Sequence, residues 1–172
     1  MEAETSIGSH ETTIGRQKYV LVDTSGFDNT QLSGSDVLQI LVDWLQSTYR
    51  EGTKLSGTLY LHRITEARMH GSALRNLTMF KELCGDNFYT NLTLGTTRWS
   101  LVDTEVAVAR ENELKHNSRF WKSMISRGSG LVRIPDDADV ARELVVKLSC
   151  HTPTTLQIQE AVDRTTTLTP RL

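Results

Sequence analysis

Short apolar runs alternate along this chain with segments whose apolar residues recur every three or four positions. The short runs are rich in β-branched and aromatic residues, which favour strands. Because the first run is almost continuously apolar, we expect it to be a parallel strand buried on both faces. The runs predict strands at Lys18–Val22, Ser56–Ile64, Asn91–Thr97 and Gly130–Ile134.

The segments between these runs have the apolar spacing of amphipathic helices. In the segment 36–52, for example, one face is apolar, Ser33 or Ser35 can cap the start, and Gly52 can close the end. Regular alternation of strands and helices predicts an α/β domain with a mostly parallel sheet. The helices are predicted at 36–52, 72–85, 104–124, 137–149 and 154–164.

Length and charge narrow the class of protein. The chain has 172 residues, is 38% hydrophobic and 23% charged, and carries a formal net charge of -2, which indicates one globular domain. It contains no basic run and no apolar window of the roughly 20 residues that a membrane span needs. We therefore expect a cytoplasmic protein that binds neither nucleic acid nor a membrane.

The stretch "DTSG" at the end of the first predicted strand is the first candidate for chemistry. Its carboxylate, Asp23, can hold a magnesium ion, and Gly26 allows a backbone N–H to approach a phosphate without a side chain in the way. Asp, Ser and Gly also form ordinary turns, so the stretch alone leaves both interpretations open.

Other catalytic patterns are absent from the sequence. No serine stands in Gly-x-Ser-x-Gly, and no His-x-x-x-His pair or cluster of acids indicates a hydrolytic metal site. We predict no catalytic residue on these grounds. Glu111 and Lys115, four positions apart on a predicted helix, are interpreted as solvated charges on the helix surface.

Four stretches taken together carry a resemblance to a known family. They are "YVLVDTSGFDNT" at Tyr19–Thr30, the long run at Val42–Gly85 that includes "LSGTLYLHRI", "TLGTTRWS" at Thr93–Ser100, and "FWKSMISRGS" at Phe120–Ser129. Over Thr12–Leu148 the chain resembles P-loop GTPase domains of the fungal branch related to septin-like and immune-associated GTPases.

This resemblance implies a three-layer P-loop NTPase-like G domain with a mostly parallel sheet, which acts as a guanine-nucleotide switch with Mg²⁺ and GTP. It divides the chain into a partial G domain at 1–150 and a C-terminal helix and tail at 151–172. It also implies roles for single residues. Asp23 matches the acid of the magnesium site, Thr5 the switch threonine that completes the magnesium shell, Gly26 the glycine facing the γ-phosphate, and Thr97, Trp99 and Ser100 the guanine-reading segment, with Trp99 packed under the base.

Three departures from the family pattern affect the expected activity. The phosphate-binding loop Gly-x-x-x-x-Gly-Lys-Ser/Thr is absent, Ser25 replaces a proline, and Ser100 replaces the aspartate that accepts two hydrogen bonds from guanine, with Asp103 three residues later. GTPase activity is implied by the resemblance, whereas the missing loop argues against it. We predict that this polypeptide binds GTP weakly or not at all.

The missing loop also predicts a gap in the sheet. In the family, the strand before that loop lies between the strands that match Lys18–Val22 and Ser56–Ile64. The residues before Lys18 can supply one edge strand, in a hairpin that turns at Gly15, but not the central strand and its helix. We therefore expect a G domain truncated at its N-terminus.

Three explanations of the gap are open. The two strands pair directly, a partner chain fills the space, or the loop is encoded upstream. We favour the last, because Met1 begins inside what resembles the first switch.

Two functional hypotheses follow from the sequence. The first is a GTP-binding protein that is a fragment or a degenerate member of its family. The alternative is a pseudo-GTPase that keeps the fold and serves as a protein-interaction module, with another protein or a second copy of the chain as its partner.

Overall fold

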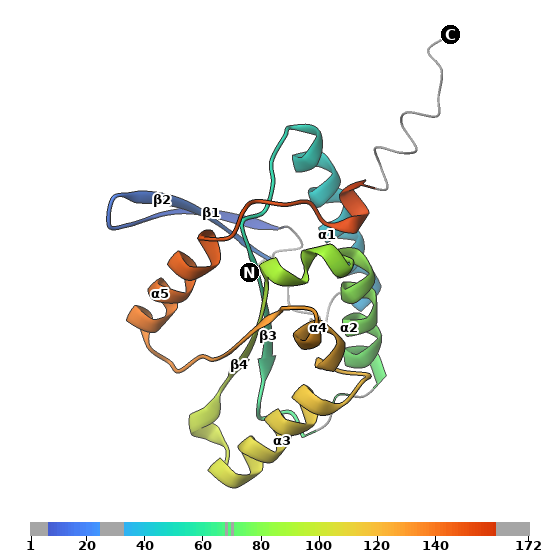
Figure 1. Ribbon diagram of the computed structural model, residues 1–172, viewed down its shortest axis with the longest axis vertical. Helices are drawn as coiled ribbons and strands as arrows, with labels where there is room; N and C mark the ends of the chain where they lie inside the picture. Colours follow the sequence, from blue (N-terminus) through green and yellow to red (C-terminus); the bar gives the residue numbers. More distant parts are fainter. Residues whose placement is uncertain (1–6, 25–32, 68, 70, 161–172) are drawn as a thin grey trace.

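The computed structural model describes residues 7–24, 33–67, 69 and 71–160, and in these residues it forms two separate β-sheets (Figure 1). One is an antiparallel hairpin of β1 and β2, and the other is a parallel sheet in the order β3-β4-β5. The strands are β1 (Gly8–Ile14), β2 (Gln17–Asp23), β3 (Thr58–Arg63), β4 (Leu92–Thr97) and β5 (Gly130–Arg133).

Helices lie on both sides of the parallel sheet, which makes this an α/β fold with three layers. In Figure 1, α5 stands on one side of β3 and β4, while α2, α3 and α4 stand on the other. The helices are α1 (Gly34–Arg50), α2 (Gly71–Cys84), α3 (Thr104–His116), α4 (Lys122–Ser126) and α5 (Ala138–Ser149), with 3-10 turns at Asp86–Asn91 and Trp99–Leu101. The predicted fold class and the mostly parallel sheet are confirmed.

The main hydrophobic core lies between the sheet and helices α2, α3 and α4. From the central strand, Leu92 and Leu94 point into it and are 1% and 0% exposed. Side chains of the surrounding segments close over them. These include Leu77 and Phe80 of α2, Ala107 and Leu114 of α3, Met124 of α4, and Phe88 and Trp121 from the connecting segments.

The opposite face of β4 is packed more closely against its neighbours. A Cβ placed on Gly95 would lie 2.7 Å from Ile134 Cδ1 and 3.1 Å from Leu61 Cδ2. Gly57, just before β3, touches Leu148 near the end of α5, where an added Cβ would lie 2.9 Å from the Leu148 carbonyl oxygen. Glycine at these two positions therefore permits the close approach of neighbouring strands and of α5.

Helix α1 starts where the sequence predicted a cap. Ser33 is the N-cap; its side chain accepts from the Asp36 N–H, and the Asp36 carboxylate accepts from the Ser33 N–H at 3.0 Å. This capping box satisfies N–H groups that the first turn leaves unpaired. Of the two serines considered, Ser33 is the cap.

The first predicted strand is not the buried parallel strand that its composition favoured. It forms β2, which pairs only with β1 among the described residues, and its Val20 and Leu21 are 62% and 40% exposed. A continuous apolar run predicts burial only when other elements cover both faces, and the described residues do not provide them. The predicted hairpin that turns at Gly15 is confirmed, with Gly15 at a φ of 63°.

Direct pairing of the first two long strands, one of the three explanations of the gap, is also wrong. β2 and β3 belong to different sheets, and β3 is paired only on its β4 side within the described part of the chain. Leu61, on the same face of the sheet as Gly95, is 56% exposed.

The helix predicted at 104–124 is two helices. α3 ends at His116, and the chain turns through Asn117 before α4 begins at Lys122. Asn117 breaks the helix, because its backbone is extended, with φ -78° and ψ 126°, and its Oδ1 accepts from the Arg119 N–H at 2.9 Å. After this turn Phe120 and Trp121 lie in the core at 6% and 0% exposure.

The segment after α5 returns to the body of the molecule. Leu55 and Thr154 form an isolated antiparallel bridge, and the buried Gln159 side chain donates to the Leu45 carbonyl oxygen of α1 at 3.1 Å. A helical turn begins at 157, so the start predicted at 154 is wrong, because Thr154 is held in the bridge with Leu55. Residues 161–164 of the predicted helix lie outside the described residues. None of the described helices combines the length and apolar character needed to cross a membrane.

Candidate functional site

The residues proposed for phosphate and magnesium are only partly described. Asp23 ends β2 on an exposed position, in register with Gly8 of the hairpin. Gly26 and Thr5 lie outside the described residues. Since Asp23 belongs to the hairpin sheet, strand pairing does not join it to the carboxyl edge of β4, where the sequence placed the rest of the site.

Of the residues that the sequence proposed as magnesium ligands, only Asp23 is among the described residues. Among its described residues, no group of three His, Cys, Asp or Glu side chains is arranged to hold a metal ion. A magnesium site in a protein usually combines one or two carboxylates with phosphate oxygens and water. Asp23 can serve as such a carboxylate, but the described residues do not assemble the remainder of a site.

The segment after β4 does lie where the parallel sheet predicts a ligand site, at the carboxyl ends of the strands. The Thr97 carbonyl accepts from the Ile64 N–H at 3.0 Å, which joins the ends of β3 and β4. Arg98 then takes the left-handed conformation, with φ 65° and ψ 31°, and is the only non-glycine residue with positive φ in the described part of the chain. A 3-10 turn from Trp99 to Leu101 leads into α3.

The Trp99 side chain is held on its edge and on one face. Its indole Nε1 donates to Thr96 Oγ1 at 3.0 Å, and Thr96 is fully buried. The guanidinium carbon of Arg133, at the end of β5, lies 4.2 Å from the centre of the indole ring, in the geometry of a cation–π contact. The sequence interpretation, with Trp99 packed under a base, did not anticipate Arg133 on the ring.

Arg133 is in turn held by Glu111 of α3. Its Nε donates to Glu111 Oε1 at 2.9 Å and its Nη2 to Glu111 Oε2 at 2.6 Å, a two-bond contact between planar groups. Lys115 Nζ donates to Glu111 Oε2 at 3.0 Å. The Arg133 guanidinium beside Glu111 holds the pKa of that carboxyl below its usual value, even though burial acts in the opposite direction.

Glu111 is the functional candidate that sequence reasoning missed. Its side chain is 2% exposed, so the interpretation of Glu111 as a solvated helix charge is wrong, although its pairing with Lys115 exists. The i, i+4 spacing is compatible with a surface pair or with a buried acid. Only the position of Arg133, 22 residues away along the chain, decides between them.

The loop offers no carboxylate to replace the missing guanine-reading aspartate. Ser100 is exposed. Asp103, the nearest acid along the chain, is the N-cap of α3, where its Oδ1 accepts from the Glu105 N–H at 2.9 Å and the Val106 N–H at 3.4 Å. Because Asp103 is committed to the helix start, the loop can offer a base only hydroxyl, backbone and cationic groups.

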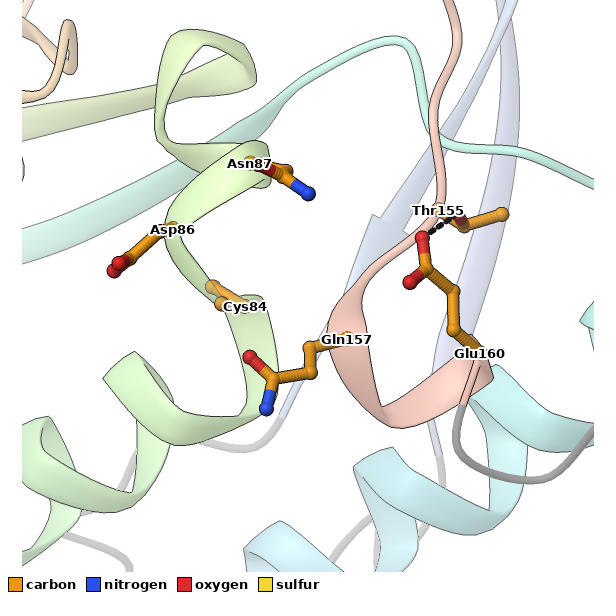
Figure 2. Close-up of a pocket in the computed structure, with 7 residues that line it drawn as sticks. Cys84, Asp86, Asn87, Thr155, Gln157 and Glu160 are labelled. Carbon is orange, nitrogen blue, oxygen red and sulfur yellow. Dashed lines mark hydrogen bonds between the residues drawn. The ribbon is translucent and has the colours of Figure 1, made fainter. Parts of the chain in front are cut away.

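A cavity of about 370 Å³ lies elsewhere, near the amino end of β4 (Figure 2). Figure 2 shows the side chains of Asp86 and Asn87 on one wall and of Gln157 and Glu160 on the other, with Thr155 donating to Glu160 Oε1 at 2.9 Å. Cys84 also lines the cavity, but burial raises the pKa of its thiol to about 12, so it is no thiolate nucleophile at neutral pH. None of the residues proposed from the sequence lines this cavity.

Comparison with known proteins identifies the fold. No protein-family model matches the chain, and no curated protein matches its sequence. Among solved structures, it is similar to Toc33 from Arabidopsis thaliana. A dimerization-deficient mutant of Toc33 has 9% sequence identity and a TM-score of 0.67, over 91% of this chain and 74% of that chain.

Two further Toc33 structures contain nucleotide. The complex with GDP and Mg²⁺ has a TM-score of 0.67 at 10% identity, over 89% of this chain and 74% of that chain. The complex with Mg²⁺ and GMPPNP has a TM-score of 0.64 at 12% identity, over 87% of this chain and 71% of that chain. At these identities the likeness concerns the backbone fold, and the chain thus has the α/β fold of a P-loop GTPase G domain.

Proposed function

We propose that this chain is a cytoplasmic G domain of the guanine-nucleotide-binding kind, and that by itself it binds GTP and Mg²⁺ weakly or not at all. The observation that carries the proposal is the similarity of its fold to Toc33, a protein whose structures include complexes with GDP and with GMPPNP. The loop after β4 supports it, because that loop stands at the carboxyl edge of the parallel sheet, where α/β folds bind ligands.

Weak binding follows from what the described residues can offer a nucleotide. A triphosphate is ordinarily held by a glycine-rich loop with a lysine, and the sequence lacks that motif. A guanine base is ordinarily selected by a carboxylate that accepts two hydrogen bonds. Ser100 cannot do this, and Asp103 caps α3. On this proposal, the chain has the fold of a nucleotide-binding domain but lacks two of the groups that ordinarily hold a nucleotide.

Titration of the purified chain with a fluorescent GTP analogue and Mg²⁺ tests the proposal. We expect no saturation at micromolar nucleotide, and sub-micromolar binding would refute the chemical part of the proposal. Ser100→Asp supplies the missing carboxylate. If this variant binds nucleotide, the ratio of its affinity for GTP to its affinity for ATP should be higher than in the parent chain. If binding occurs, Asp23→Ala should weaken its dependence on Mg²⁺.

Exposed apolar side chains on the strands favour a second candidate, an interaction module. Leu61 on β3 is 56% exposed, and Val20 and Leu21 on β2 are 62% and 40% exposed. Apolar side chains left exposed in this way can form the contact surface for another protein.

We propose a second copy of the chain as the partner for this candidate. Sedimentation at several concentrations would show self-association, and Leu61→Lys should reduce it by replacing one of these apolar side chains with a charged one. Val146→Lys is the matched control, because Val146 is an exposed apolar residue of α5 at 37% exposure. A chain that remains monomeric at all concentrations would remove this candidate.

A further inference from the structure

We propose that Glu111 is a positioning residue that fixes the loop after β4, acting through Arg133 and Trp99, and thereby sets how this loop meets a bound base. The role toward a base rests on the proposed function. The mechanical role, which is to hold Trp99, stands on the geometry of three side chains from α3, β5 and the loop.

The first step is the burial of the Glu111 carboxylate. At 2% exposure it loses almost all contact with water, and both oxygens are used by protein donors. Replacing a buried ion pair by apolar side chains is often neutral or stabilising, so such a pair is weak evidence of a role in stability. The two parallel hydrogen bonds do fix the orientation of the Arg133 guanidinium plane.

The second step is the contact between that plane and the indole ring. Arg133 is 51% exposed, so without Glu111 its long side chain would be free to move in solvent. With Glu111 it lies over Trp99, whose Nε1 is simultaneously bound to the buried hydroxyl of Thr96. The ring is therefore constrained by a contact on its face and a hydrogen bond at its edge.

The third step links the ring to the loop backbone. Trp99 follows Arg98, whose left-handed conformation is unfavourable for a residue with a side chain and persists only when its surroundings impose it. On its other side the loop is fixed by the Asp103 cap. A held Trp99 between these two points leaves Ser100 exposed in one orientation at the carboxyl edge of the sheet.

The experiment reads the indole N–H of Trp99 by nitrogen-15 NMR on the full chain without nucleotide. The chain has three tryptophans, and Trp99→Phe identifies the signal of interest. We expect Glu111→Gln and Arg133→Ala each to shift this signal and to remove its protection from exchange with water, while the signal of Trp44 on α1 stays in place. Arg133→Lys keeps the charge but cannot make the two parallel bonds, so it should not restore the parent spectrum.

Arg127→Ala is the matched control, since it breaks an exposed ion pair with Asp86 far along the chain from this loop and should leave Trp99 unchanged. If both Glu111→Gln and Arg133→Ala keep the parent Trp99 signal and the parent circular dichroism spectrum, the inference is wrong. Should Glu111→Gln fail to fold, Arg133→Ala decides the question, because the Arg133 side chain is half exposed.

The outcome is separable from that of the proposed function. If the Trp99 signal shifts in a chain that binds no nucleotide, the mechanical role of Glu111 in holding Trp99 is supported and the base-contacting role of the loop is contradicted. If the chain binds GTP but its Trp99 signal does not respond to Glu111→Gln, only the mechanical role is refuted. Where GTP does bind, Arg133→Ala should lose preference for GTP over ATP, and an unchanged preference contradicts the base-contacting role.

Discussion

Strand β2 of the hairpin and strand β4 of the parallel sheet both come from predicted strand runs, and they lie in opposite environments. In β2, Val20 is 62% exposed, whereas in β4, Leu94 is 0% exposed. β4 has a parallel neighbour on each side, and helices stand on both sides of its sheet, while β2 has one antiparallel neighbour in the described residues. The difference shows that residue composition predicts whether a segment forms a strand. Whether that strand is buried depends on the elements that pack beside it and over it.

The largest expected contrast comes from truncating one apolar side chain in each region. Leu94→Ala should lower the free energy of unfolding by about 2–5 kcal/mol, because it leaves a cavity in a packed core. Val20→Ala should change it by less than about 0.5 kcal/mol. Urea denaturation of both variants measures the two values. A loss of several kcal/mol from Val20→Ala would show that the hairpin is covered in solution.

The second prediction concerns the charged contact that ties the parallel sheet to its loop. Glu111→Gln should cost about 1.5–3 kcal/mol at neutral pH, nearer the lower value because Arg133 is half exposed. Since the folded pKa of Glu111 lies below its ordinary value of 4.5, its stabilisation is present above that pH and is lost as the pH falls through the lowered pKa.

Denaturation of parent and Glu111→Gln chains between neutral and acid pH measures this. The gap in unfolding free energy should narrow as the pH drops below 4.5. A gap that stays constant down to the acid unfolding of the chain would mean that the carboxylate contributes nothing through its charge.

The third prediction tests the close packing of β4 on its second face. Gly95→Ala should cost about 1 kcal/mol, because the added methyl would lie 2.7 Å from Ile134 Cδ1, the end of a side chain that must shift but can do so. Thermal unfolding would record it as a lower midpoint. Combining the change with Ile134→Val should recover part of the loss, and no recovery would point to the backbone as the cause.

The smallest effect is expected at an exposed ion pair far from either strand comparison. Arg127→Ala, which removes the partner of Asp86, should change the unfolding free energy by no more than about 1 kcal/mol, and less at high salt. Both side chains are more than half exposed. A larger or salt-independent loss of unfolding free energy would show that Arg127 stabilises this edge of the cavity through contacts other than its ion pair with Asp86.

Residue patterns within a segment predicted the secondary structure well where the ends of an element are set by residues of that segment. Helix α1 begins at a serine cap that the sequence indicated, and α2 spans Gly71–Cys84, within one residue of the helix predicted at 72–85. The prediction of a single helix at 104–124 was wrong because it overlooked Asn117, whose extended backbone ends α3 and whose Oδ1 accepts from the Arg119 N–H at 2.9 Å.

For the candidate site, the sequence predicted the position of the loop after β4 but not the side chains that contact it. The position of Thr97, Trp99 and Ser100 at a strand end follows from the order of strands and helices. The partners of Trp99 do not, because Arg133 and Glu111 come from β5 and α3, and each was compatible with a solvent-facing role. Asp23 remains a prediction, and its proposed companions Gly26 and Thr5 lie outside the described residues.

By itself, the sequence determined the alternation of strands and helices, the serine cap, the hairpin at Gly15 and the loop at the end of β4. These depend on propensities and spacings within a few residues of chain. Only the tertiary structure decided that β2 stays apart from the parallel sheet and that Glu111 is buried beneath Arg133. The physical reason is that strand pairing and charge burial are set by contacts between residues far apart in sequence, which no local pattern encodes.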